Sequence, residues 1–197
     1  MSVINAARIG IALTLIAHVS ALILSELSAR STPISQLSRG DYGTVHTIGL
    51  LSLALAWGVL IRPLWQLDTA RLWRLGCTLL VASIGALIYV AYYFATADDA
   101  TLFGEQANDP LSVLASTLGV AMGAMQPALK QLNRLAAQVN LTILILWLAL
   151  IPVIPFLETQ WLGAYERTVG ILMLVWSWLL TGLVADTPSA LSPMNRH

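Results

Sequence analysis

The stretch Leu72–Thr96 reads LWRLGCTLLVASIGALIYVAYYFAT and carries a single charge, that of Arg74. A helix that crosses a hydrocarbon core of about 30 Å needs roughly 20 mostly apolar residues. The run is long enough for such a helix, and it lacks the alternation of apolar and polar residues that strands of a membrane barrel show. This stretch therefore predicts a membrane-spanning helix.

Similar runs fill most of the remaining chain. Its 197 residues are 57% hydrophobic and only 10% charged, with a mean hydropathy of +0.77, whereas a soluble domain carries about 25% charged residues. We therefore predict an all-α integral membrane protein, a six-transmembrane-helix domain over residues 1–185 with a short flexible tail at 186–197. The predicted spans are Ile4–Ser25, Gly43–Ile61, Leu72–Thr96, Leu111–Leu129, Ala137–Leu157 and Tyr165–Ala185.

The basic residues divide unevenly between the two sides of such a bundle. Lysine and arginine concentrate in cytoplasmic loops, and this bias sets the orientation of a membrane protein. With a cytoplasmic N-terminus, most of the basic residues fall inside and only Arg30, Arg39 and Arg167 fall outside. We therefore predict that both termini are cytoplasmic. The inner basic residues are then Arg8, Arg62, Arg71, Arg74, Lys130, Arg134 and Arg196.

Small and polar residues recur at helical spacing in most of the spans. Helices in a bilayer associate through small residues that permit close approach and through polar residues that bond across the interface. We therefore expect these residues to face the interior, with His18, Ser116, Gly119 and Gly123 serving helix packing. The stripes are Thr14, His18, Ala21 and Ser25; Thr78, Ala82, Gly85, Tyr89 and Tyr92; Ser112, Ser116, Gly119, Gly123, Gln126 and Lys130; and Arg167, Gly170, Leu174, Ser177 and Thr181.

The larger polar side chains lie in the half of the predicted bundle that faces away from the cytoplasm. The first outer loop, which contains Pro33 and Gly40, is expected to fold back over this end of the bundle. This pattern favours an outward-facing pocket, in which a guanidinium would meet a phosphate or carboxylate headgroup. The alternative is a salt bridge between Arg167 and Asp41, Asp109 or Glu26. The predicted ligand-binding residues are Arg39, His46, Tyr89, Tyr92, Ser112 and Arg167.

Catalytic signals are weak. Ser35, Asp41 and His46 contain the residue types of a nucleophilic triad, but no Gly-x-Ser-x-Gly elbow accompanies them. A catalytic metal needs about three converging ligands, and only His18 and His46 lie within the predicted bundle, so we expect no metal. No cofactor motif is found, so we expect no cofactor. A net charge of zero also argues against nucleic-acid binding.

Two short motifs carry a family resemblance. The segment Thr32–Gly40, TPISQLSRG, leads through Gly43 into the second span, and Tyr165–Arg167 opens a last span that contains Trp176. Together with six spans in about 200 residues, these motifs resemble the bacterial membrane family called domain of unknown function 998. The resemblance implies a six-span protein of the bacterial cytoplasmic (inner) membrane, without a settled activity. The matching positions are Pro33, Ser35, Gly40, Glu166 and Arg167.

Three functions remain open from the sequence. The first is a non-catalytic protein whose partners are membrane lipids, which binds a lipid or another amphipathic ligand in the outer pocket, or which packs as an accessory subunit of a larger membrane complex. The second is an intramembrane lipid-directed hydrolase that uses Ser35, Asp41 and His46. The third is a small transporter, although the internal repeats typical of transporters are not evident.

Overall fold

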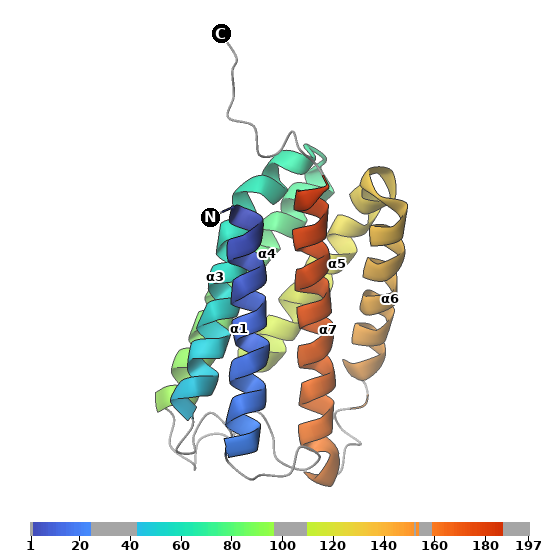
Figure 1. Ribbon diagram of the computed structural model, residues 1–197. Coiled ribbons are helices and arrows are strands. Elements are labelled where there is room, and N and C mark those ends of the chain that lie inside the picture. The colour runs from blue at the N-terminus through green and yellow to red at the C-terminus, as the bar shows by residue number, and fades with distance from the viewer. Residues whose placement is uncertain (1, 25–42, 97–109, 152, 154–158, 187–197) are drawn as a thin grey trace.

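The computed structural model describes residues 2–24, 43–96, 110–151, 153 and 159–186. In these segments the chain forms six helices that lie side by side (Figure 1). The prediction of an all-α fold with six helices is confirmed for the described residues. The helices are α1 (Val3–Leu24), α3 (Gly43–Leu67), α4 (Arg71–Thr96), α5 (Pro110–Leu132), α6 (Arg134–Leu150) and α7 (Thr159–Ala185).

Four of these helices are long and apolar enough to cross a membrane. They are α1, α3, the part of α4 over Arg71–Tyr93, and the part of α7 over Gly163–Ala185. Helix α6 is apolar but has only 17 residues, and α5 contains Gln126, Pro127 and Lys130 near its end. Length and composition therefore establish a multi-pass helical membrane protein.

The ends of three helices differ clearly from the predicted spans. Helix α3 continues to Leu67, six residues beyond the predicted Ile61. Helix α6 begins at Arg134, three residues before the predicted start, because Asn133 caps it: the Ala136 amide donates to the Asn133 side chain at 3.0 Å. It ends at Leu150, just before Pro152, which has no amide hydrogen to continue a helix. Helix α7 begins at Thr159, one and a half turns before the predicted Tyr165.

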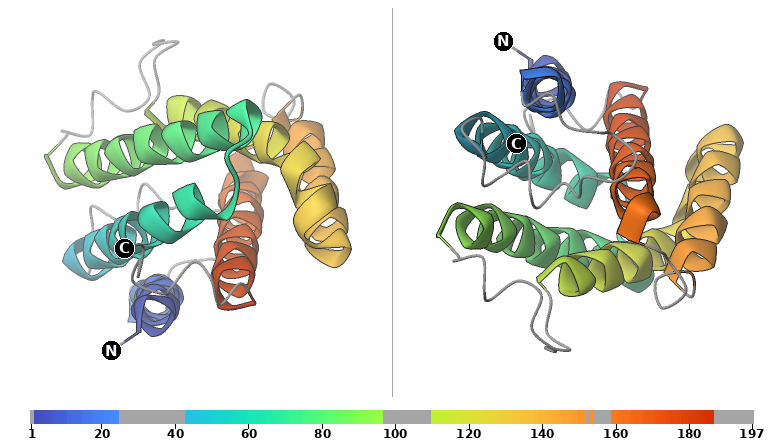
Figure 2. Two further views of the ribbon diagram at one scale, coloured as in Figure 1. Left: turned by 90° about the horizontal axis from the view of Figure 1, so that it is seen from above. Right: turned by 90° about the horizontal axis from the view of Figure 1, so that it is seen from below.

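The six helices form a closed ring. Each helix packs against the helix that follows it in the chain, and α7 packs against α1 to complete the ring. Helix α7 also contacts α3 across the ring, so it lies near the centre in both end-on views (Figure 2). Helix α1 begins and α7 ends at the same end of the bundle (Figure 1).

Helices α1 and α3 make the closest backbone approach in the described part of the bundle. A Cβ atom added at Gly10 would lie 2.7 Å from the Ser52 carbonyl oxygen, and one at Gly49 would lie 2.8 Å from the Ala17 Cβ atom. The Thr14 hydroxyl donates to the Gly49 carbonyl at 2.9 Å. Small residues therefore place α1 directly on α3, as the stripe through Thr14 and Ala21 predicts.

Fully buried tryptophans fill the core, and their indole N–H groups all find acceptors. Trp57 donates to the Ser177 hydroxyl at 2.8 Å, and Trp73 donates to the Leu64 carbonyl at 2.7 Å. A buried indole N–H without an acceptor would be costly, so these bonds fix how α3 meets α7 and α4. The only cysteine, Cys77, is also completely buried on α4.

The predicted interior face of α4 is wrong. Thr78, Ala82 and Gly85 are exposed, and Tyr89 and Tyr92 are 55% and 65% exposed. The interior face consists instead of larger residues, among them Trp73, Cys77, Leu80, Ser83 and Leu87. Lipid tails are as apolar as leucine, so large apolar residues are free to face either way in a membrane helix.

The small-residue face of α5 is confirmed in its middle and wrong at one end. A Cβ atom at Gly119 would lie 3.3 Å from the Trp147 ring of α6, and one at Gly123 would lie 3.9 Å from Leu144. Trp147 in turn donates to the Ala115 carbonyl at 3.0 Å. Ser116, however, is exposed, so it does not pack between helices of this chain.

Candidate functional site

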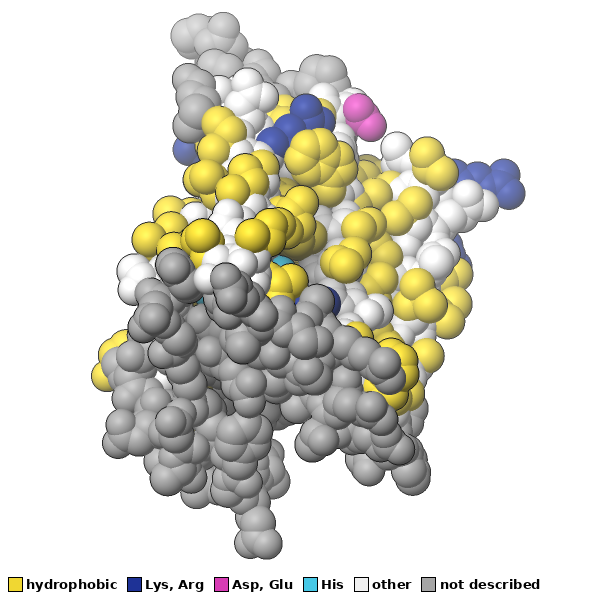
Figure 3. Space-filling model, turned by 60° about the horizontal axis from the view of Figure 1, so that its bottom comes forward, with side chains coloured by type: hydrophobic (Ala, Val, Ile, Leu, Met, Phe, Trp, Pro, Cys, Tyr) yellow, Lys and Arg dark blue, Asp and Glu magenta, His cyan; other side chains and the backbone are white. Residues whose placement is uncertain are grey.

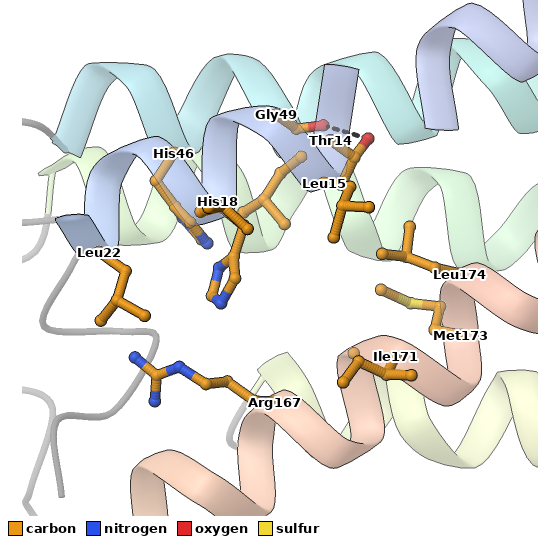
Figure 4. Close-up of a pocket in the computed structure, with 13 residues that line it drawn as sticks. Thr14, Leu15, His18, Leu22, His46, Gly49, Arg167, Ile171, Met173 and Leu174 are labelled. Atoms are coloured by element: carbon orange, nitrogen blue, oxygen red, sulfur yellow. Dashed lines mark hydrogen bonds between the residues drawn. The ribbon is translucent and has the colours of Figure 1, made fainter. Parts of the chain in front are cut away.

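A pocket lies between α1, α3 and α7 (Figure 4). It is in the half of the bundle that contains the end of α1 and the start of α7, which is the lower half in Figure 1. Its volume is about 240 Å³. Three nitrogen-bearing side chains, His18, His46 and Arg167, share it with mostly apolar walls. The apolar and small lining residues are Leu15, Val19, Leu22, Gly49, Leu50, Gly170, Ile171, Met173 and Leu174, and Thr14 completes the lining.

The two histidines meet at the boundary of α1 and α3. Their ring centroids are 5.4 Å apart, and the ring planes are inclined by 62°, so one ring presents its edge to the other. His46 is buried and His18 is half-buried. The Nε2 atom of His18 is buried and makes no hydrogen bond to any residue that the structure describes. His18 therefore meets α3 through its ring contact with His46.

Helix α7 supplies the opposite wall of the pocket. Arg167 extends from α7 toward Leu22, across the space from His18 (Figure 4). One turn later, a Cβ atom added at Gly170 would meet nothing within 4 Å, although Gly170 lines the pocket. The absence of a side chain at Gly170 therefore helps to keep the pocket open. Its apolar walls and clustered nitrogens are typical of small-molecule sites, which combine hydrophobic linings with a few polar groups.

The pocket opens toward the outside of the bundle. With the bottom of the bundle tilted forward, small areas of histidine are visible among mainly hydrophobic side chains (Figure 3). Leu15 and Ile171 line the pocket and are still 48% and 56% exposed. The pocket is therefore reachable from the side of the bundle that membrane lipids would cover.

The structure brings together two of the predicted ligand-binding residues, His46 and Arg167, and adds His18, which the sequence assigned to helix packing. It does not bring Tyr89 and Tyr92 to the pocket, because both lie exposed on α4. Ser112 is in the first turn of α5, which does not line the pocket. Arg39 and the predicted fold of the first outer loop lie outside the described residues.

The catalytic alternative rests on a single described residue. Ser35 and Asp41 lie outside the described residues, as do Glu26 and Asp109, two of the predicted partners of Arg167. The ring of His46 faces that of His18. Within the described segments, no group of three or more His, Cys, Asp or Glu side chains is arranged to hold a metal ion.

The sequence analysis missed a buried polar cluster between α5, α6 and α7. The Asn140 amide donates to the Gln126 side chain at 2.7 Å and to the Met122 carbonyl at 3.0 Å, and its oxygen accepts from the Trp176 indole at 2.8 Å. Gln126 also donates to the Ala137 carbonyl at 3.1 Å. All of these bonds run between the described helices, so the cluster holds α5, α6 and α7 together. An asparagine within an apolar span was the available signal.

Comparison with known proteins adds no assignment to these observations. No protein-family model, no curated protein and no solved structure matches this chain.

Proposed function

We propose that this protein binds a lipid or another amphipathic molecule in the pocket between α1, α3 and α7, and that it acts without catalysing a reaction. The observation that carries the proposal is the His18 Nε2 atom, which is buried at the pocket without a hydrogen bond to the described residues. A buried polar atom of this kind costs free energy until a partner satisfies it. A polar headgroup that enters the pocket would supply that partner.

The walls of the pocket indicate the other half of the ligand. Leu15, Val19, Ile171 and Leu174 give a hydrophobic surface that is open to the side. Burial of an acyl chain or a similar apolar group on this surface is favourable by about 25 cal/mol for each Å² removed from water. Arg167 and His46 add positive or hydrogen-bonding character at the polar end, which favours a headgroup with acceptor oxygens.

We further propose the location and orientation of the bundle. The chain would lie in a bacterial cytoplasmic membrane, with all six helices spanning it and both termini in the cytoplasm, which places the pocket in the outer leaflet. The distribution of arginine and lysine supports this orientation. The likeness to domain of unknown function 998 stays a prediction, and the binding proposal does not depend on it. Roles as an accessory subunit, hydrolase or transporter also stay predictions.

The orientation has a direct test. A phosphatase that is active only outside the cytoplasm, fused after His197, is expected to be inactive, and the same fusion after Leu67 is also expected to be inactive. A fusion after Thr96, at the opposite end of α4, is expected to be active. Activity of the fusion after His197 would contradict the proposed orientation.

Filling the pocket tests the binding proposal. Gly170→Leu places a side chain into the open space, so we expect it to abolish retention of the amphiphile that co-purifies with the wild-type protein in a mild detergent. The measurement is mass spectrometry of the organic extract from equal amounts of protein. Gly182→Leu is the matched control, because Gly182 lies on the same helix with open space at its Cβ position and does not line the pocket.

A second variant tests the polar end of the pocket. His18→Leu removes the imidazole while keeping a similar volume, and we expect it to reduce the retained amphiphile at least fivefold, because the headgroup loses a hydrogen-bond partner. Equal retention by the wild type, Gly170→Leu and Gly182→Leu would refute the binding site. Loss in Gly170→Leu without loss in His18→Leu would refute the role of His18.

A further inference from the structure

A second polar contact joins α1 and α7 at the end of the bundle opposite to the pocket. The guanidinium carbon of Arg8 lies 5.2 Å from the centre of the Trp178 ring. Arg8 is the only Asp, Glu, Lys or Arg residue of α1, and it lies five residues after the start of that helix, about 7.5 Å along its axis. In a helix that spans a membrane, this position is close to the level of the lipid headgroups.

The described protein leaves part of the Arg8 guanidinium unsatisfied. Its Nε atom is buried and makes no hydrogen bond within the described segments. The acidic residues of those segments are Asp68, Glu166 and Asp186, and none of them forms an ion pair with Arg8. A charged side chain within a membrane span is costly unless it is paired. The contact with Trp178 compensates for only part of that cost.

We propose that Arg8 and Trp178 bind the phosphate group of a phospholipid from the leaflet at this end of the bundle. The Trp178 ring, which is 50% exposed, supports one face of the planar guanidinium. The N–H groups lie in the plane of the guanidinium, so stacking leaves them at its edge, where they match the oxygens of a phosphate. Arginine binds phosphate in this two-point manner more specifically than lysine does.

The surface next to this pair fits the acyl chains of the same lipid. Leu15 and Val19 follow Arg8 on one face of α1 at helical spacing, and Ile171 and Leu174 precede Trp178 on one face of α7. All four residues line the pocket, so the acyl chains of this lipid would lie along the apolar wall of the pocket, a surface between α1 and α7 that we call the seam. From Arg8 to Val19 the helix rises about 16 Å, close to half of a hydrocarbon core about 30 Å thick. One leaflet's acyl chain therefore spans this seam.

The polar end of this site is distinct from the polar end of the pocket, because neither Arg8 nor Trp178 lines the pocket, whereas the apolar wall is common to both. The chain also offers a close comparison at the same end of the bundle. The guanidinium of Arg74 lies 5.8 Å from the centre of the Trp65 ring, but Arg74 is exposed and has no buried nitrogen without a hydrogen bond. If stacking alone recruited the lipid, both pairs would bind it equally.

Native mass spectrometry of the delipidated full-length protein tests the site with three defined probes: phosphatidylglycerol, diacylglycerol with the same acyl chains, and inorganic phosphate. We expect phosphatidylglycerol to bind the wild type most tightly, with diacylglycerol about tenfold weaker because it lacks the phosphate. We expect Arg8→Gln to weaken phosphatidylglycerol binding about tenfold and Trp178→Leu about threefold, with Arg74→Gln unchanged. Inorganic phosphate is expected not to compete, because it gains nothing from the apolar seam.

Several results would overturn the proposal. Equal binding of diacylglycerol and phosphatidylglycerol would show that the phosphate is not recognised, and competition by inorganic phosphate would show a site for free phosphate. Loss of binding in Gly170→Leu but not in Arg8→Gln would place the lipid in the pocket. Should Arg8→Gln fail to fold, Arg8→Lys keeps the charge without the two-point geometry. We expect it to bind about threefold more weakly, and unchanged binding by Arg8→Lys would count against the site.

Discussion

Asn140→Leu is expected to lower the free energy of unfolding by about 3 kcal/mol. Leucine has nearly the same size, so the loss comes from polar groups that stay buried without partners. The Trp176 indole loses its acceptor, and the Gln126 side chain and Met122 carbonyl lose their donor. A single hydrogen bond between membrane helices is worth about 0.6 kcal/mol on average, but here one substitution removes three. The measurement is unfolding by sodium dodecyl sulfate in mixed micelles, followed by circular dichroism.

Two further variants show whether the cluster is responsible for this loss. Gln138→Leu removes an exposed amide two residues away on the same helix, and it is expected to change the free energy of unfolding by less than about 0.5 kcal/mol. Trp176→Phe removes one donor and part of a completely buried ring, and it is expected to cost about 2 kcal/mol. A wild-type unfolding energy in Asn140→Leu, or equal losses in Asn140→Leu and Gln138→Leu, would show that the cluster does not hold α5, α6 and α7 together.

Gly10→Ala is expected to lower the free energy of unfolding by about 2 kcal/mol. The added Cβ atom would lie 2.7 Å from the Ser52 carbonyl oxygen and 2.9 Å from the Ala56 Cβ atom. Both neighbours belong to the α3 helix rather than to a flexible side-chain end, so α1 must move away from α3. Forcing atoms into a packed interface typically costs 1–3 kcal/mol. The same unfolding assay measures the loss.

Gly58→Ala provides the matched comparison for this prediction. A Cβ atom at Gly58 meets nothing within 4 Å, so the substitution is expected to be neutral, or to stabilise α3 by up to about 1 kcal/mol through the better helix propensity of alanine. A gain in stability from both substitutions would mean that α1 and α3 are not in close contact at Gly10.

The faces of α1 and α7 could be predicted from the sequence because their small and polar residues do the packing. Thr14 bonds to the Gly49 carbonyl, Ser177 accepts from Trp57, and Thr181 is buried. A residue with a hydroxyl is costly against lipid unless it finds a partner, so its position indicates the interior. On α4 the exposed Thr78 hydroxyl is satisfied by its own helix, since it donates to the Arg74 carbonyl, so it needs no neighbouring helix. Such residues carry little information about direction.

The candidate site was only partly predictable for a related reason. Arg167 and His46 stood out as polar residues near the end of the bundle away from the termini. The approach of His18 to His46, however, depends on how closely α1 packs on α3, which Gly49 and Ala17 determine. Spacing along one helix gives the face of a residue but not the neighbour that it meets on the next helix. Tyr89 and Tyr92 were expected at the pocket and lie exposed on α4 instead, because the position of α4 relative to α1, α3 and α7 could not be read from spacing along α4.

The complete burial of Cys77 makes the wild-type chain a ready background for thiol chemistry. Maleimide reagents in water react with accessible thiols, and the only natural one is enclosed within the bundle. A cysteine introduced at an exposed site, such as Ser116, would then be the sole labelled position in the folded protein. Spin labels or fluorophores for distance and depth measurements can therefore be attached one at a time without first replacing a core residue.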